Sequence, residues 1–154
     1  MGQQQLLLVI LVTILVGIAT VVAINVFGSA ANQANRDAVR QDLLQGASAG
    51  QAIWIKPVLL GGAGRDFDAN MTDETLTDQI NIPGRRTPAG GNIVTNENGV
   101  YTITIDSEDS FSISAVPSTW ENTILIEVSW DTANRVWDIS IDDGGEVDET
   151  TPVT

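Results

Sequence analysis

The sequence predicts an α+β fold in which one long N-terminal helix, over about residues 3–56, packs on a C-terminal antiparallel sheet of about four strands. Three observations lead to this prediction. The chain opens with an apolar run from Leu6 to Phe27, and a polar segment of helical periodicity follows without a break. The second half of the chain alternates apolar and polar residues at a period of two, as half-buried strands do.

The apolar run is long enough to cross a bilayer. It contains 22 residues, and the first charged side chain of the chain is Arg36. As a helix the run covers about 33 Å, against a hydrocarbon core of about 30 Å. A secretory signal combines a positively charged start with a shorter apolar stretch. We therefore expect residues 1–28 to form a membrane anchor whose helix protrudes from the rest of the fold.

Residues 29–56 continue the helix as an amphipathic half. Five apolar or small residues recur at spacings of three and four and form one stripe: Val39, Leu43, Ala47, Gly50 and Trp54. The stripe is too rich in small residues for a coiled coil, and it favours a helix that lies on a sheet. Pro57 cannot donate a backbone hydrogen bond and is expected to end the helix.

The sheet is predicted over residues 100–154, after a loop-rich connection over 57–99 in which glycine and proline pairs recur. Alternating segments place strands near 100–106, 110–116, 123–130 and 135–141. Asn98-Gly99 and residues 131–134 are credible turn sites. Short links between the strands predict an antiparallel meander. The acidic tail from Asp142 to Thr154 is expected to be a surface strand, a loop or a frayed end.

Composition excludes several classes of function. The net charge is −13, and 18 of the 20 carboxylates follow residue 60, so we expect no nucleic-acid partner. The chain has no cysteine and no histidine, which rules out thiol chemistry, Cys/His zinc sites and histidine general-base catalysis. It also lacks a G-x-S-x-G elbow and a Walker loop. We expect no catalytic residue and no enzyme activity.

One short segment has the spacing of a metal site. Asp66, Asp68 and Asn70 place oxygen ligands at alternate positions, as calcium requires. Met71 stands where an EF-hand loop has glycine, and Thr77 stands where it has glutamate. A solvated acidic loop is therefore the favoured interpretation. We expect no cofactor, with calcium as the minor alternative.

Three tryptophans in the predicted sheet, Trp120, Trp130 and Trp137, allow two interpretations. They could form a binding platform, or they could pack in the core. A small sheet without disulfides needs the large buried area that aromatic side chains supply. Core packing is therefore favoured, and Trp54 is expected at the contact between helix and sheet.

The segment QQQLLLVILVTILVGIATVVAINVFGSAANQANRDAVRQDLL resembles the N-terminal helix of the type IV pilin family. The resemblance implies a pilin-like fold and cleavage by a prepilin peptidase after a glycine. Met1, Gly2, Gln3 and Gln5 are then the candidates for processing and for the contact of the mature N-terminus. It also implies that residues 1–28 anchor the chain in the inner membrane only transiently. Assembly machinery there would then transfer them into the core of an extracellular filament.

In that filament, copies of the chain would pack through their apolar helices. The residues that the resemblance assigns to this assembly interface are Leu6, Leu7, Val9, Ile10, Thr13, Ile14, Gly17, Ile18, Val21, Ile24 and Phe27. The role it implies is the major structural subunit of a filament on the cell surface.

Three departures separate the chain from the bacterial pattern. The glutamate at mature position five is missing, because that position is Gln5 if the chain starts at Met1 and Leu7 if it is cut after Gly2. The apolar half has no proline, and no cysteines are present to close a C-terminal loop. Two alternatives stay open: a pseudopilin of a type II secretion system or a minor pilin, and a single-pass membrane-anchored β-domain.

Overall fold

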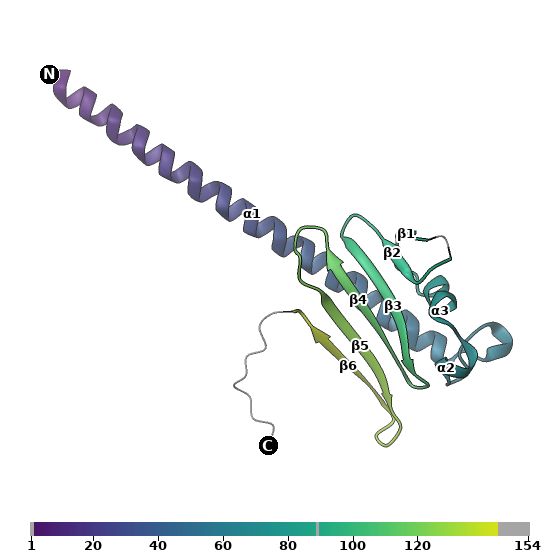
Figure 1. Cartoon of the computed structure of the whole chain (residues 1–154). Coiled ribbons are helices and arrows are strands. Elements are labelled where there is room, and N and C mark those ends of the chain that lie inside the picture. The colour runs from purple at the N-terminus through teal and green to yellow at the C-terminus, as the bar shows by residue number, and fades with distance from the viewer. Residues whose placement is uncertain (1, 89, 145–154) are drawn as a thin grey trace. The chain divides into compact units, whose positions relative to one another are not determined.

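The computed structural model describes residues 2–88 and 90–144. It contains one long helix, α1 (Gly2–Ile55), against the 3–56 that the periodicity predicts, and a six-stranded sheet (Figure 1). The short helices are η1 (Val58–Leu60), α2 (Phe67–Asn70) and α3 (Asp73–Gln79). The strands are β1 (Arg85–Arg86), β2 (Ile93–Thr95), β3 (Gly99–Ser107), β4 (Ser110–Pro117), β5 (Ile124–Asp131) and β6 (Val136–Asp142). The α+β fold is confirmed.

Two compact units make up the chain, Met1–Ala34 and Asn35–Thr154. The first is the N-terminal part of α1, and every described residue in it is helical. The second contains the rest of α1, the short helices and the whole sheet. We call Asn35–Thr154 the head.

The sheet is an antiparallel meander in the order β1-β2-β3-β4-β5-β6, so each strand pairs with the next along the chain. The four predicted strands are β3 to β6. The predicted number of about four was too low, because β2 pairs with β3 and β1 pairs in turn with β2. These two strands contain two and three residues, too few for an alternating pattern to stand out.

The connection over 57–99 is more ordered than the loop-rich segment that we expected. The carboxylate of Asp66 caps α2 by accepting a hydrogen bond from the Ala69 amide. Thr72 and Thr75 form a capping box that starts α3. The helices that follow these caps have four and seven residues, too short to show an apolar stripe.

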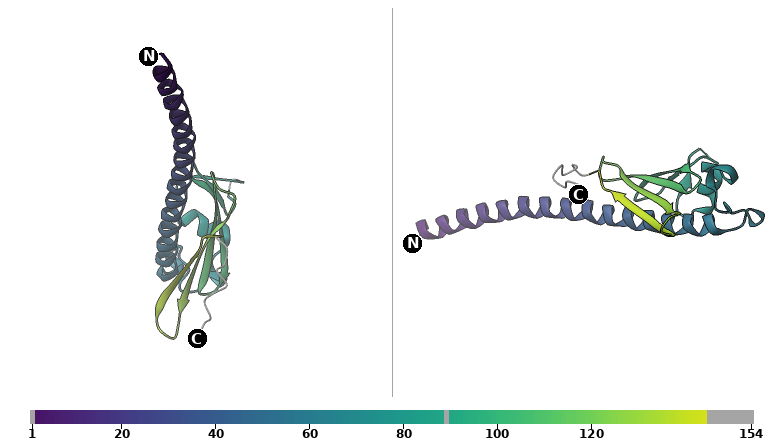
Figure 2. Two further views of the ribbon diagram at one scale, coloured as in Figure 1. Left: turned by 90° about the vertical axis from the view of Figure 1, so that its left-hand side faces the viewer. Right: turned by 90° about the horizontal axis from the view of Figure 1, so that it is seen from below.

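In the head, α1 packs on one face of the sheet (Figure 2). All five residues of the predicted stripe are buried, from Val39 to Trp54. They meet the inward-facing side chains of the strands, which are Tyr101, Ile103, Phe111, Ile113, Ala115, Ile124, Ile126 and Val128. The stripe of α1 therefore forms one wall of the core, as predicted.

Gly50 explains why the stripe contains small residues. A Cβ atom at this position would lie 2.2 Å from the ring of Phe111, a side chain that is fully buried and packs edge-on against Phe67 at 5.4 Å between ring centroids. The aromatic ring lies directly on the helix backbone at Gly50. A larger side chain would force helix and sheet apart.

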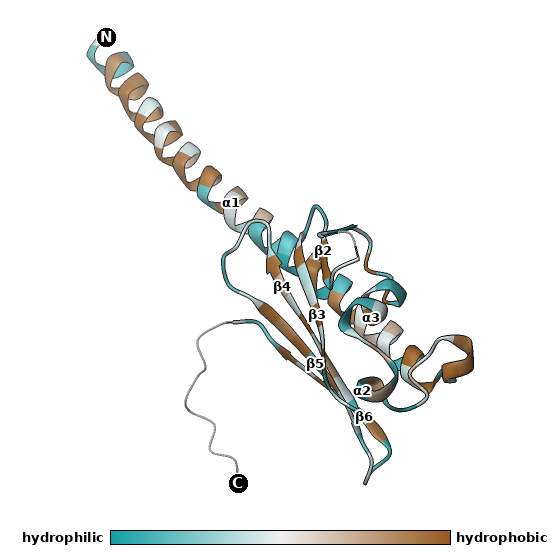
Figure 3. Cartoon of the chain, turned by 45° about the vertical axis from the view of Figure 1, so that its right-hand side comes forward, coloured by the Kyte–Doolittle hydropathy of each residue, from teal (hydrophilic) through white to brown (hydrophobic). Residues whose placement is uncertain are grey.

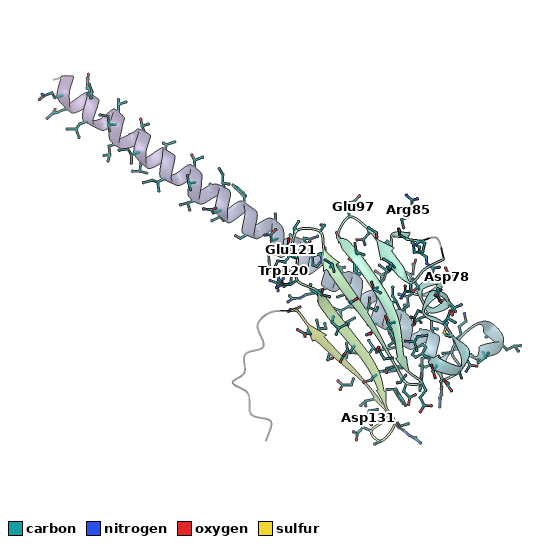
Figure 4. All side chains as sticks on the ribbon, viewed as in Figure 1. Asp78, Arg85, Glu97, Trp120, Glu121 and Asp131 are labelled. Carbon is teal, nitrogen blue, oxygen red and sulfur yellow. The ribbon has the colours of Figure 1, made fainter. Side chains whose placement is uncertain are left out.

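Both predicted turns are present. Asn96 closes the β2–β3 turn, where its side-chain oxygen accepts from the amides of Asn98 and Gly99. Asp131, labelled in Figure 4, closes the β5–β6 turn by accepting from the amides of Ala133 and Asn134. The donors at Asn134 lower the pKa of the Asp131 carboxyl. Met1 and the tail beyond Gly144, for which we predicted processing and a surface segment, lie outside the described residues.

Candidate assembly surface

The apolar segment, which we define as Leu6–Phe27, exposes all its large side chains. Sixteen leucine, isoleucine, valine and phenylalanine residues in it are between 49% and 74% exposed, and the brown run along α1 in Figure 3 marks them. Soluble monomers rarely expose an apolar surface of this extent. Such a surface is compatible with contact to lipid or to another protein.

The hydroxyls of the two threonines of the segment are satisfied within their own helix. The hydroxyls of Thr13 and Thr20 each donate to the carbonyl oxygen four residues earlier, at 2.8 Å. A hydroxyl that is satisfied within its own helix costs little when the helix enters an apolar environment. Thr13 therefore fits the assembly interface to which the resemblance assigns it.

Small residues leave places where another helix can approach. A Cβ atom at Gly17 or Gly28 would meet nothing within 4 Å. Close packing of helices in an apolar medium depends on such small residues. The described part of the N-terminal processing candidates, Gly2, Gln3 and Gln5, is helical and exposed, so these residues are accessible to a partner.

The helix has the length and composition that a membrane anchor requires. The helix contains an 18-residue window with a mean hydropathy of 3.1, none of which is buried inside the described structure. By length and composition, α1 can cross a membrane.

The residues of the calcium candidate are used within the fold. Asp66 caps α2, and the side-chain amide of Asn70 donates to the carbonyl oxygens of Ala63 and Asp66, at 2.9 and 3.3 Å. Asp68 is an acidic residue in the first turn of α2. Across residues 2–88 and 90–144, no group of three acidic, histidine or cysteine side chains has the arrangement of a metal site.

The tryptophans of the sheet pack rather than form a platform. Trp54, Trp130 and Trp137 make a three-ring cluster with centroids 5.2 to 5.4 Å apart, and the indole N–H of Trp54 donates to the carbonyl of Glu108. Trp120, labelled in Figure 4, lies under the guanidinium of Arg36 at 4.2 Å. This cation–π contact fixes the start of the head portion of α1 to the β4–β5 loop.

A polar cluster around Asp42 also joins helix and sheet, and the sequence did not reveal it. One carboxylate oxygen of Asp42 accepts from the Tyr101 hydroxyl at 2.6 Å and from the side-chain amides of Asn98 and Asn96 at 2.9 and 3.0 Å. In sequence these residues are more than 50 positions apart from Asp42. The sequence alone showed only that an acidic residue, Asp42, is next to Leu43 of the apolar stripe.

This cluster gives a pH prediction. Burial and the hydrogen bond to Asp42 raise the pKa of Tyr101 above its ordinary value. The unfolded chain therefore loses this proton first, so the cluster stabilises the fold fully below about pH 10. That stabilisation is lost as the pH rises from there through the raised pKa.

Tyr101 is the one tyrosine of the chain, so the ultraviolet absorbance of its phenolate reports on this site alone. We expect the absorbance change of the folded chain to occur at clearly higher pH than that of the chain in urea. Asp42→Asn should shift it back toward the unfolded value. Equal titration curves for folded and unfolded wild-type chains would contradict the raised pKa.

Comparison with known proteins gave no relationship for this chain: no protein-family model, no curated protein and no solved structure matches it.

Proposed function

We propose that the chain is the major structural subunit of an extracellular, type IV pilus-like helical filament, assembled by packing of its N-terminal helices. The observation that carries the proposal is the exposure of the apolar segment, in which sixteen large apolar side chains are each about half exposed or more. Its polar hydroxyls are satisfied within the helix. A polymer core made of such helices would cover all of this surface.

The proposal includes a sequence of environments. The segment would first lie in the inner membrane, where a prepilin peptidase and the assembly machinery act on it. It would then enter the filament core, and the head would face the medium. The excess of carboxylates over cations, a net charge of −13, gives the head a well-hydrated surface.

The energetics explain why machinery is needed and why the polymer would persist. Each large apolar side chain gains about 1.5–3 kcal/mol on leaving water, so sixteen of them hold a subunit firmly in a polymer that is surrounded by water. Lipid chains are as apolar as the helix core, so transfer from membrane to filament gains little of this energy. Extraction therefore requires work from outside, whereas return to water is strongly opposed.

An alternative from a different class of function is a single-pass membrane-anchored β-domain, which the same membrane-length helix would also fit. The two functions differ in where the full chain is found. We would shear cells that produce the chain, pellet the released material and examine it by electron microscopy, with mass spectrometry of the N-terminus. Filaments made of the chain support the proposal, whereas a chain that stays entirely with the membrane fraction supports the anchored domain.

The pseudopilin or minor-pilin alternative is distinguished by abundance. A major subunit should form long filaments when it is the one pilin-like chain produced. Short assemblies, or filaments in which this chain is a minor component by mass spectrometry, would favour the alternative.

A further inference from the structure

The start of α1 contains three glutamines and no charged side chain. Gln3, Gln4 and Gln5 precede the apolar segment, and Figure 3 shows this polar start of the helix in teal, before the brown run. Residues 2–34 are all helical, and none of them has a charged side chain. At about 1.5 Å per residue, this uncharged stretch of helix is about 50 Å long.

A cut after Gly2 would add one charge to this stretch. It would expose the α-amino group of Gln3, whose ordinary pKa is about 8, so most of it is an ammonium at neutral pH. Gln3 precedes Leu6 by three residues, less than one turn of helix. In the proposed filament, the new N-terminus would therefore be carried with the apolar segment into the core.

The ammonium would have no opposite charge in that core. Residues 2–34 supply no carboxylate, either from the same copy or from the same stretch of a neighbouring copy. A buried charge without a partner costs several kcal/mol. The start of a helix is also the positive end of the helix dipole and has N–H groups without helical partners. Both properties make an ammonium less favourable there.

The residue that the cut exposes can remove this charge with its own side chain. An N-terminal glutamine has an amide carbonyl carbon, Cδ, that its α-amine can reach by closing a five-membered ring. The side chain of Gln3 is exposed and has no hydrogen bond among the described residues. Neither the fold nor a bonded neighbour therefore holds this amide away from the amine.

We propose that Gln3, once it is the N-terminal residue, cyclises to a lactam (pyroglutamate). The unprotonated α-amine attacks Cδ, the bond between Cδ and Nε2 breaks, and Nε2 takes one proton from the attacking nitrogen and leaves as ammonia. The step needs no oxidant, reductant or second substrate. It rests on the proposed function, because the cut after Gly2 is what makes Gln3 the first residue.

The lactam removes the charge and most of the unsatisfied donors. An ammonium has three N–H donors that need partners, whereas the lactam has one N–H and is neutral. The hydroxyls of Thr13 and Thr20 are already bonded within the helix. The cyclised helix would then enter the apolar core without a charge, and a carboxylate from a neighbouring copy would not be required.

Mass spectrometry of the N-terminal peptide tests the proposal directly. Filaments sheared from cells that produce the full chain are expected to give a peptide that begins at Gln3 and is lighter by one ammonia molecule than the sequence requires. An isotope-labelled synthetic peptide with an uncyclised N-terminal glutamine, added before digestion, would report any ring closure during handling.

The lysine content provides a second measurement. The chain has one lysine, Lys56, so an amine-reactive reagent in urea should add one label to the wild-type chain. Gln3→Asn should take two labels, because an N-terminal asparagine would need a strained four-membered ring. Gln4→Asn is the matched control and should take one. A Gln3→Asn chain that is cut but does not assemble can be counted in the membrane fraction.

Each outcome supports or overturns the proposal. A filament chain that begins at Gln3 with a free amine, or with a group added to that amine, overturns it and leaves the proposed function intact. Filaments whose chain begins at any other residue also overturn it. If the wild-type chain forms no filaments, the proposed function fails, and the cyclisation proposed for its core fails with it.

Discussion

Val16→Asp is expected to abolish filament assembly while the head stays folded. Val16 lies in the middle of the apolar segment and is 58% exposed, and it is not one of the buried residues that form the core of the head. A carboxylate at the centre of a membrane helix costs about 2.5–3.5 kcal/mol on insertion scales. In a packed helix core without a partner it costs several kcal/mol more, and the cost recurs in every subunit.

Electron microscopy of sheared material would measure the loss of filaments. The near-ultraviolet circular dichroism of the tryptophan cluster would show that the head is folded. Membrane fractionation would separate failed insertion from failed assembly. Val100→Asp is the control for the added charge, since Val100 is an exposed residue of β3. Normal filaments from Val16→Asp would contradict the proposed core.

Removal of residues 1–28 is expected to give a water-soluble monomer with a folded head. All the buried hydrophobic residues of the described structure lie between Val39 and Val128, so the deletion leaves the core complete. It removes the sixteen large exposed side chains of the apolar segment. The remaining chain has a head with an excess of carboxylates, and like-charged heads should not hold a polymer by themselves.

Sedimentation velocity and circular dichroism of the shortened chain would test this expectation. A folded species with the mass of one chain at micromolar concentration is the expected result. Fibres formed by the shortened chain would show that contacts between heads, rather than contacts between apolar segments, drive assembly.

The predictable parts of this fold are those in which one pattern runs over many residues. The stripe from Val39 to Trp54 repeats over four turns of helix, and its burial is confirmed. The strands β3 to β6 have seven to nine residues each, enough for the period of two to appear. Local hydrogen-bonding residues such as Asp131 also marked their turns, because their side chains act on amides two and three positions ahead.

The missed parts depend on contacts between distant segments. β1 is defined by its pairing with β2, and β2 by its pairing with β3, rather than by their own few residues. The cluster at Asp42 joins side chains from α1, β3 and the β2–β3 turn. No residue spacing in the sequence predicts that these side chains meet. Residues 55–61 looked like the start of an ordinary glycine-rich loop, and only the structure shows that four exposed aliphatic side chains are held there by backbone hydrogen bonds.

For the candidate site, the sequence identified the residues of the apolar segment, and the structure adds their exposure and the internal bonding of Thr13 and Thr20. Assembly requires contacts between copies of the chain, so the proposed interface has to be tested in the filament itself.

The most direct measurement is a helical reconstruction of the filament by cryo-electron microscopy. The account predicts a solid core of packed helices in which Leu6–Phe27 of each copy is buried against the same segment of its neighbours, with the heads outside. A filament joined through heads alone, with the apolar segments unpacked or covered by lipid, would contradict it.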